Sequence, residues 1–193
     1  SECLVGSEMC IRDRAGTLVM TKEGYKAIEK IEEGEEVLSY NENLGIFEYK
    51  EVVEVYKNET KELSHIKTKK DEIVSTPGHS ILTSEGWKKA KDIKVNDLIK
   101  TKEGYERVIE VDSEELEEVE NVYNLNVLGY HTYVVGYGLL VVHNLCDIKE
   151  GATERVQYNY NGKKTNAYNT GGGKTYYAID RSKHGGSYYK GFE

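Results

Sequence analysis

From residue 15 onward the chain alternates short apolar runs with polar turns that contain glycine. The first run, Ala15-Gly16-Thr17-Leu18-Val19-Met20-Thr21, is closed by Lys22-Glu23-Gly24-Tyr25, which is typical of a strand followed by a tight turn. Ala27, Ile28 and Ile31 then follow at helical spacing, over a stretch too short for more than a turn or two. Further strands are predicted at residues 37–40, 46–56, 64–68, 72–75, 107–111, 122–127 and 132–142. The pattern therefore predicts an all-β fold.

The opening pattern occurs twice. Residues 82–99 repeat the order found in residues 19–38: a strand, a Glu-Gly-aromatic turn, a short helical turn and a second strand. The two turns are Glu23-Gly24-Tyr25 and Glu85-Gly86-Trp87. An internal repeat of this kind predicts a pseudo-symmetric β body. Residues 114–120 hold five carboxylates in seven positions, which favours a solvated edge or loop.

Composition adds three constraints. With 193 residues the chain can form one ordinary domain, or one domain plus a fragment. No apolar run approaches the length needed to span a membrane, so no transmembrane segment is predicted. The three cysteines, Cys3, Cys10 and Cys146, form neither a disulfide framework nor a metal-ligand spacing, so we expect no metal and no cofactor.

The net charge of −8 is unevenly distributed. Residues 15–144 carry 16 Lys and Arg against 26 Asp and Glu, whereas residues 145–193 carry eight against five. The sign of the charge therefore changes at Asn144. This change predicts two units, residues 15–144 and residues 145–193, with different partners.

The first fourteen residues do not follow this pattern. From Cys3 to Arg14 they resemble one reading frame of a transposase adapter used in sequencing libraries. We therefore expect residues 1–14 to be an artefact or disordered and set them aside from fold reasoning. The alternative is a genuine N-terminal tail without a pattern.

The run Val141-Val142-His143-Asn144 offers the clearest chemistry. An asparagine can cut its own chain when its side-chain nitrogen attacks its own carbonyl, closes a succinimide and expels the next residue's amine. A neighbouring histidine can polarise that carbonyl or protonate the leaving amine. Alone, a His-Asn pair more often simply ends a strand, so this interpretation depends on partners upstream.

Those partners resemble a known family. Ala15-Gly16-Thr17, Thr76-Pro77-Gly78-His79, Val122-Tyr123-Asn124-Leu125, the segment from His131 to Gly136 and Val141-Val142-His143-Asn144 stand in the order and at the spacing of a Hint domain. Inteins and hedgehog autoprocessing domains share this fold. The most similar subtype is the bacterial intein-like domain that precedes toxin modules in polymorphic toxins. The resemblance implies a pseudo-symmetric, horseshoe-like β fold, followed by a small α+β or β-rich extension.

In this family a Cys or Ser three residues before Ala-Gly-Thr attacks the preceding carbonyl and turns an amide into a thioester or ester. That position is Arg12 here, which cannot act as a nucleophile, and the natural residue is unknown. The resemblance implies that Thr76 and His79 bind and distort the scissile peptide and protonate the departing amine. The alternative is a turn threonine and a satisfied histidine at a strand end.

The terminal step is assigned, again by resemblance, to His143 and Asn144. His131 resembles a second histidine that tunes His143 or relays its proton, although packing beside Tyr133 is nearly as good an interpretation. His65 matches no block and is expected on the surface. Leu145 stands where splicing requires Cys, Ser or Thr, so cleavage of the Asn144–Leu145 bond without ligation is predicted.

The tail from Leu145 is basic and rich in tyrosine and glycine. Its end resembles short C-terminal toxin modules with a His-Gly-Gly element, often nucleases that act on RNA. In that interpretation His184 serves as base or acid beside the cations Arg181, Lys183 and Lys190. A basic strand-turn-strand with a solvent-facing histidine is an equal alternative, and Glu193 is not assumed to be the true end.

Two functional hypotheses follow. The first is a self-processing domain, its own substrate, that cleaves after Asn144 and releases a basic effector. The second is an inactive Hint carrier that presents a nuclease-type toxin, with an immunity protein and RNA as partners. A secreted or cell-surface bacterial location is implied by the resemblance alone.

Overall fold

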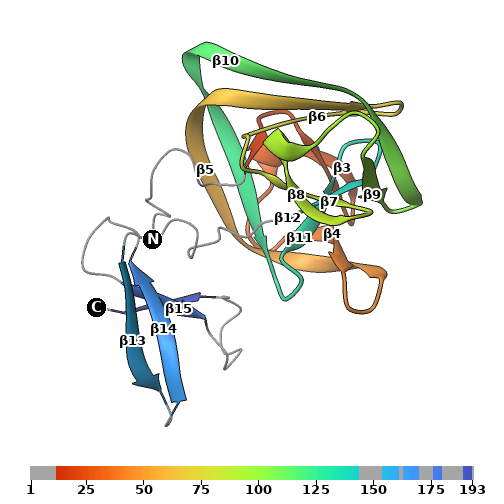
Figure 1. Cartoon of the computed structure of the whole chain (residues 1–193). Coiled ribbons are helices and arrows are strands. Elements are labelled where there is room, and N and C mark those ends of the chain that lie inside the picture. Colours follow the sequence, from red (N-terminus) through yellow and green to blue (C-terminus); the bar gives the residue numbers. More distant parts are fainter. Residues whose placement is uncertain (1–11, 144–153, 161–162, 170–175, 180–188, 193) are drawn as a thin grey trace. The chain divides into compact units, whose positions relative to one another are not determined.

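Two long antiparallel strands, β5 (Ile46–Thr68) and β10 (Gly104–Val127), dominate the fold of this computed structural model, which describes residues 12–143, 154–160, 163–169, 176–179 and 189–192. They pair from Val108 opposite Thr68 to Val127 opposite Val52. At about 3.3 Å per residue, a straight strand of this length would span roughly 75 Å. Three register shifts in the pair allow the strands to bend, and Figure 1 shows them curving around the shorter strands.

The shorter strands complete one antiparallel network around this pair. In spatial order the sheet runs β10-β1-β6-β5-β4-β2-β11-β12-β9-β7-β8, with β3 on β2 and further contacts of β10 with β5 and β9 and of β12 with β7. The bounds are β1 (Asp13–Arg14), β2 (Leu18–Thr21), β3 (Gly24–Ala27), β4 (Glu36–Asn41), β6 (Glu72–Ser75), β7 (Ser80–Thr83), β8 (Gly86–Lys89), β9 (Leu98–Thr101), β11 (Thr132–Val135) and β12 (Leu140–His143). Most of these strands pair with partners distant in sequence.

The predicted internal repeat is confirmed. The β2–β3 hairpin pairs Thr21 with Gly24, and the β7–β8 hairpin pairs Thr83 with Gly86. In each turn the threonine hydroxyl donates to the glycine carbonyl at 2.7 Å. Both glycines have a positive φ, which a side chain disfavours, so the Glu-Gly-aromatic sequence suits the turn. A single turn of 3₁₀ helix follows each hairpin, η1 (Ile28–Lys30) and η2 (Ala90–Asp92).

The repeat extends to the segments that precede each hairpin. The amide of Ile28 donates to the carbonyl of Thr17 at 2.8 Å, and the amide of Ala90 donates to the carbonyl of His79 at 2.7 Å. His79 therefore occupies in the second copy the position that Thr17 occupies in the first. The pseudo-symmetry itself determines where the Thr-x-x-His segment lies.

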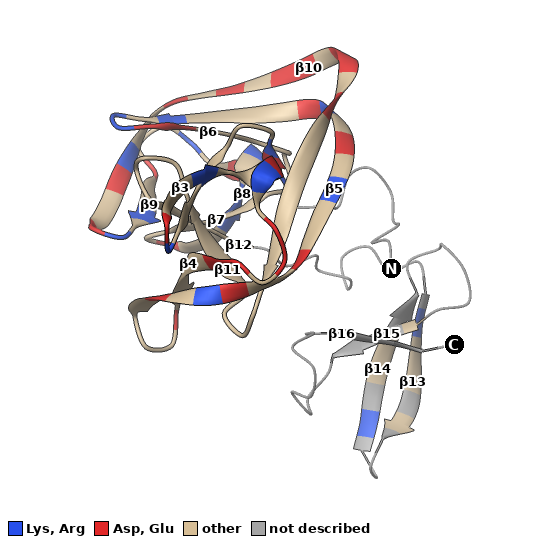
Figure 2. Cartoon of the chain, turned by 180° about the vertical axis from the view of Figure 1, so that it is seen from behind, with Lys and Arg blue, Asp and Glu red and all other residues tan. Residues whose placement is uncertain are grey.

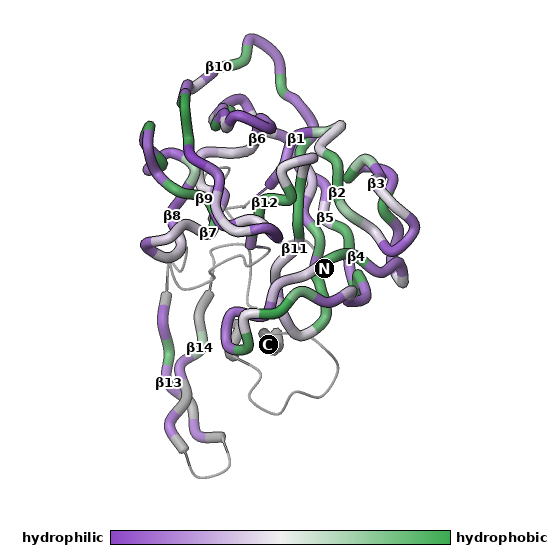
Figure 3. The backbone as a smooth tube through the Cα atoms, turned by 90° about the vertical axis from the view of Figure 1, so that its right-hand side faces the viewer, coloured by the Kyte–Doolittle hydropathy of each residue, from purple (hydrophilic) through white to green (hydrophobic). Residues whose placement is uncertain are grey.

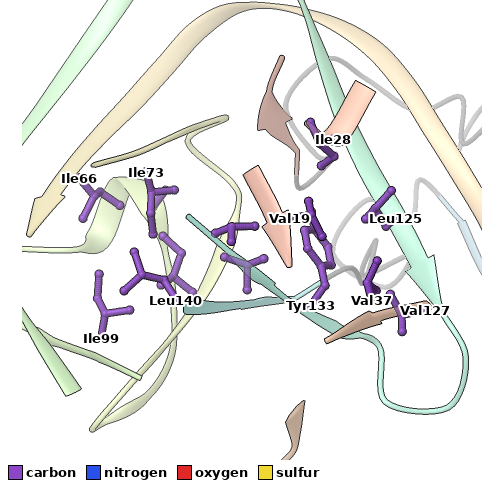
Figure 4. Close-up of a cluster of buried hydrophobic side chains, with 14 of the residues drawn as sticks. Val19, Ile28, Val37, Ile66, Ile73, Ile99, Leu125, Val127, Tyr133 and Leu140 are labelled. Carbon is purple, nitrogen blue, oxygen red and sulfur yellow. The ribbon is translucent and has the colours of Figure 1, made fainter. Parts of the chain in front are cut away.

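The core consists mainly of valine, isoleucine and leucine side chains, and β11 and β12 contribute alternate residues to two separate clusters. Figure 4 shows the main cluster, in which Val19, Leu140 and Tyr133 meet residues of the long strands such as Ile66 and Leu125. A second cluster contains Leu38, Leu82, Val134 and Val141, with Trp87 packed against it. Figure 3 shows the hydrophobic segments on inner strands such as β2 and β12. This burial is the main favourable term for the fold.

Carboxylates follow the long strands instead. Residues 114–120 lie within β10 and are mostly solvent-exposed, so they form a solvated strand and not a loop (Figure 2). His65 in β5 lies on the same pair of strands, with its ring nitrogens 3.2 Å from Glu72 Oε1 and 2.8 Å from Glu114 Oε2. Burial lowers the pKa of His65, but the hydrogen bonds that its ring donates to these carboxylates outweigh this effect and raise the pKa overall.

Asp71 fixes the turn between β11 and β12. The amide of Gly138 donates to Asp71 Oδ2 at 3.0 Å. Gly136 in the same turn has φ +70°, and a Cβ there would lie 2.0 Å from Asp71 Oδ2. This turn aligns β12, whose last described residue is His143.

The chain divides into two compact units, Cys10–Leu145 and a second that contains the C-terminal strands. Those strands are β13 (Glu154–Tyr160), β14 (Lys163–Asn169), β15 (Tyr176–Ile179) and β16 (Tyr189–Phe192), which form an antiparallel sheet in chain order. No α-helix occurs in the described part of the chain, which confirms the all-β class. Nor does that part contain a helix long and apolar enough to cross a membrane.

Candidate functional site

The segment Thr76-Pro77-Gly78-His79 connects β6 to β7 as a tight, fixed turn. The amide of His79 donates to the carbonyl of Thr76 at 3.0 Å. A second hydrogen bond joins the turn to η2, because the amide of Lys91 donates to the carbonyl of Pro77 at 3.0 Å. His79 is fully buried, and Thr76 is buried beside it. The turn therefore presents both side chains inside the unit.

Arg12 and Thr76 are joined by a reciprocal pair of hydrogen bonds. The amide of Arg12 donates to Thr76 Oγ1 at 3.1 Å, and the amide of Thr76 donates to the carbonyl of Arg12 at 2.9 Å. Thr76 thus binds the main chain at the position where the family carries its first nucleophile. Next to it, Asp13 and Arg14 form β1, which pairs with β6 and β10, although they belong to a segment set aside on sequence grounds. The origin of residues 1–14 stays a prediction.

Asp13 lies at the centre of a buried polar network. Tyr133 donates its hydroxyl to Asp13 Oδ2 at 2.6 Å and lies 3.2 Å from Asn124 Oδ1. Burial raises the pKa of Tyr133 well above its ordinary value, and the Asp13 charge and hydrogen bond raise it further. The other carboxylate oxygen lies 3.3 Å from His79 Nε2, although these two atoms lack hydrogen-bond geometry. Asp13 therefore connects Tyr133 to the histidine.

Several buried polar atoms here have no hydrogen-bond partner among the residues that the structure describes. They are Nε and Nη1 of Arg12, Oδ1 of Asp13 and both ring nitrogens of His79. Buried polar groups in folded proteins are nearly always paired, and exceptions gather at functional sites. The buried polar atoms without hydrogen-bond partners therefore distinguish this site from the rest of the described core.

His143 reaches the same place from the other end of the unit. It is the last residue of β12 and lies opposite Thr132 at the start of β11. Burial, together with the smaller effects of the nearby charges of His131 and His79, lowers the pKa of His143 from 6.5 to about 4. His131 directly precedes β11, has φ +54° and has a pKa lowered by burial. Three histidines therefore share one region.

This arrangement determines the charge state in which His143 acts. With a pKa of about 4 its ring is neutral at neutral pH. A neutral imidazole has one nitrogen that accepts a proton and one N–H that donates. Such a ring in a low-dielectric site can polarise a carbonyl or relay a proton between two nitrogens.

The predicted site residues have different outcomes. Thr76, His79, His131 and His143 come together, and His65 lies on the surface-exposed strand pair, as expected. The others, apart from Lys190, lie outside the described residues: Asn144, Leu145, Arg181, Lys183 and His184. Lys190 lies in β16, opposite Ala178.

Sequence reasoning missed Asp13, Tyr133 and Trp87. Asp13 was set aside with residues 1–14, and Tyr133 was considered only as a packing partner of His131. Trp87 was noted as the aromatic residue of the second turn, yet its ring lies 4.8 Å from that of His143, centroid to centroid. The position of Trp87 directly after the turn glycine Gly86 marks it as part of a hairpin. No feature of the neighbouring sequence indicates that it contacts His143.

No group of three or more His, Cys, Asp or Glu side chains in the described ranges is arranged to hold a metal ion. The polar groups here are instead a buried threonine, carboxylate and phenol, the buried imidazole of His79 and the half-buried imidazoles of His131 and His143, which are suited to hydrogen bonding and proton transfer.

Comparisons with known proteins agree with this geometry. The family described as the pretoxin HINT domain matches residues 18–145. A bacterial intein-like domain from Clostridium thermocellum is 32% identical, with a TM-score of 0.67, and the alignment covers 69% of this chain and 99% of that one. No curated protein sequence gives a significant match.

Inteins share the fold at lower identity. The DnaB intein from Synechocystis sp. PCC 6803 is 22% identical, with a TM-score of 0.60, over 69% of this chain and 98% of that chain. The gp41-1 intein is 27% identical, with a TM-score of 0.56, over the same shares of the two chains. The chain therefore belongs to the pretoxin HINT domain family and shares its fold with inteins.

Proposed function

We propose that residues 15–144 form a self-processing domain that cuts its own chain between Asn144 and Leu145 and so releases the residues that follow. The main support is that His79 lies near both ends of the unit. It is 3.3 Å from Asp13, the neighbour of position 12, and its charge acts on His143. A carrier without chemistry has no need to keep both ring nitrogens of a fully buried histidine without hydrogen-bond partners among the described residues, as is the case for His79.

The cleavage is an internal displacement. The side-chain nitrogen of Asn144 attacks its own main-chain carbonyl carbon, a succinimide closes, and the C–N bond to Leu145 breaks. One proton leaves the side-chain amide and one is gained by the departing Leu145 nitrogen. The neutral ring of His143 is suited to carry that proton from one nitrogen to the other. The step consumes no metal, oxidant or cofactor.

Ligation of the flanks is not part of the proposal. Joining them requires a side-chain nucleophile after Asn144, and Leu145 has none. The released segment begins at Leu145, carries net positive charge, and contains Arg181, Lys183, His184 and Lys190. We propose that it is a toxin-like effector, with RNA as a candidate substrate and an immunity protein as a candidate partner.

One observation favours the inactive-carrier alternative. Arg12 occupies the nucleophile position and is 4% exposed, so an N-terminal acyl shift cannot occur in this chain. If the two cleavage steps are coupled, the chain is inert at its C-terminal end as well.

Intact-mass measurement after incubation at neutral pH separates the two functions. Three proteins are compared: the chain as it stands, an Arg12→Cys variant with a short leader, and that variant with Asn144→Ala. We expect a fragment that ends at Asn144 in the second protein and none in the third. Cleavage in the first protein as well would mean that cyclisation is independent of the N-terminal step.

The histidine roles need a matched control. In the Arg12→Cys background, His79→Ala and His143→Ala should each abolish or strongly slow the break, whereas His65→Ala on the exposed strand pair should leave its rate unchanged. Fragmentation that persists in Asn144→Ala would point to a contaminating protease. No break in any protein would refute self-processing and favour the carrier.

A further inference from the structure

Trp87 is the one aromatic side chain for which the structure gives a ring contact with a histidine in the described part of the chain. Its ring lies 4.8 Å from that of His143, centroid to centroid, at an interplanar angle of 82°. This is an edge-to-face arrangement, the geometry that aromatic pairs prefer. The contact connects the second hairpin of the repeat to the last residue of β12.

The indole is itself fixed at two points. Trp87 Nε1 donates to Glu42 Oε1 at 2.9 Å, from the turn between β4 and β5. Its apolar face packs against the cluster that contains Leu82 and Val141. A side chain held at one end by a hydrogen bond and along its face by packing has little rotational freedom.

Strand register explains why this ring meets this histidine. Val142 in β12 pairs with Ile81 in β7, and Leu82 in β7 pairs with Trp87 in β8. Alternate residues of a strand share a face, so Val141 and His143 lie on the same side of β12. Trp87 lies on that side two strands away, where a large indole can reach His143 diagonally.

We propose that Trp87 is a positioning residue that holds the imidazole of His143 in the orientation needed to transfer a proton during cleavage after Asn144. The inference rests on the proposed self-processing function and adds to it a residue outside the Hint motif blocks.

The contact has a second effect, on hydration. The indole covers part of the His143 ring, and burial is the main cause of the low His143 pKa, with His131 and His79 as the charged neighbours that add to it. Removal of the indole should therefore raise the pKa of His143 toward its ordinary value. If Trp87 only stabilised its own hairpin, its removal would leave the pKa of His143 unchanged.

The test combines two measurements on the Arg12→Cys chain with its leader. The first is the NMR titration of His143, observed in labelled protein that carries Asn144→Ala so that it stays intact. The second is the cleavage rate by intact mass in the cleavable chain. Trp87→Ala should raise the His143 titration midpoint by about one pH unit or more. It should also slow cleavage about 10- to 100-fold.

Two further variants distinguish positioning from loss of folding. Trp87→Phe keeps an aromatic ring and should retain most of the rate. Phe47→Ala removes an aromatic side chain from the same cluster, where its ring packs on that of Tyr40. This control should leave the His143 titration unchanged, and both variants should keep dispersed amide spectra.

The failures are distinguishable. An unchanged His143 titration and an unchanged rate in Trp87→Ala would overturn the proposal. A rate that falls equally in Phe47→Ala would also overturn it, because general packing would then explain the effect. If the parent does not cleave, the proposed function itself fails, and Trp87 is only a packing partner of His143 whatever the titration shows.

Discussion

Removal of the Arg12 charge should stabilise the fold. The Arg12 side chain is 4% exposed, and its Nε and Nη1 atoms have no hydrogen-bond partner among the described residues. A buried charge is expensive unless it is paired and hydrogen-bonded, because its hydration is lost. Arg12→Met keeps an unbranched apolar stem of similar length and removes only the guanidinium.

The expected gain is scaled from replacements of buried ion pairs by apolar side chains of similar volume, since Arg12→Met likewise removes a buried charge. Such changes stabilise proteins by about 1–4 kcal/mol. For a chain of this size each kcal/mol raises Tm by about 3 °C, so the increase should be about 3–12 °C. The main-chain hydrogen bonds of Arg12 to Thr76 do not depend on the side chain and should persist.

Arg14 provides a matched control two positions along the chain. Its side chain is 39% exposed and pairs with Glu120, with Nε 2.7 Å from Oε2. Exposed ion pairs contribute about 0.2–1 kcal/mol, so Arg14→Met should lower stability slightly. The two substitutions are chemically identical but should have opposite signs because the two sites differ in burial and pairing.

Urea unfolding followed by tryptophan fluorescence measures both variants. Trp87 is the only tryptophan of the chain and lies in the Hint unit, so the signal reports on that unit alone. An Arg12→Met variant that is less stable than the parent, or indistinguishable from Arg14→Met, would refute the reasoning. It would mean that solvent or another group stabilises the Arg12 guanidinium.

Two further predictions concern pH and a turn. Because the pKa of His143 is about 4 in the folded state and 6.5 when unfolded, the unfolded state binds more protons between these values. The free energy of unfolding should be unaffected above pH 6.5 and fall by up to about 3 kcal/mol as pH drops to 4, and His143→Gln should remove this loss. In urea unfolding, Gly136→Ala should lower the free energy of unfolding by about 1 kcal/mol more than Gly129→Ala does. Both glycines have positive φ, but only at position 136 would the added Cβ meet Asp71. Equal losses of stability would contradict this contact.

The sequence by itself determined the local elements of this protein. Alternation of apolar and polar residues predicts strands because the side-chain period of a strand is two, and a Glu-Gly-aromatic turn predicts a hairpin because glycine tolerates positive φ. These rules depend on neighbours only a few residues apart. They were sufficient to predict an all-β class and the repeat, which the hairpins at Gly24 and Gly86 confirm.

Strand continuity was less well predicted. Residues 114–120 were expected as a solvated edge or a loop. They continue β10 instead, paired with β5 at Glu114, Glu115 and Glu120, and the register shifts across the residues between Glu115 and Glu120. When both faces of a strand are polar and exposed to solvent, its side chains do not alternate between apolar and polar, and the sequence gives no sign that its main chain is paired. The length of β5 and β10 was missed for the same reason.

The candidate site was decided by tertiary structure. The bond from Arg12 to Thr76 spans 64 positions, and the bond from Tyr133 to Asp13 spans 120. Motif blocks identified Thr76, His79 and His143, but no local rule states that the Asp13 carboxylate and the Trp87 ring lie beside those histidines. Sheet topology brings these groups together, and the resulting burial sets the low pKa of His143. Charge state and contact depend on everything that surrounds a group in space, and the sequence alone specifies only its neighbours along the chain.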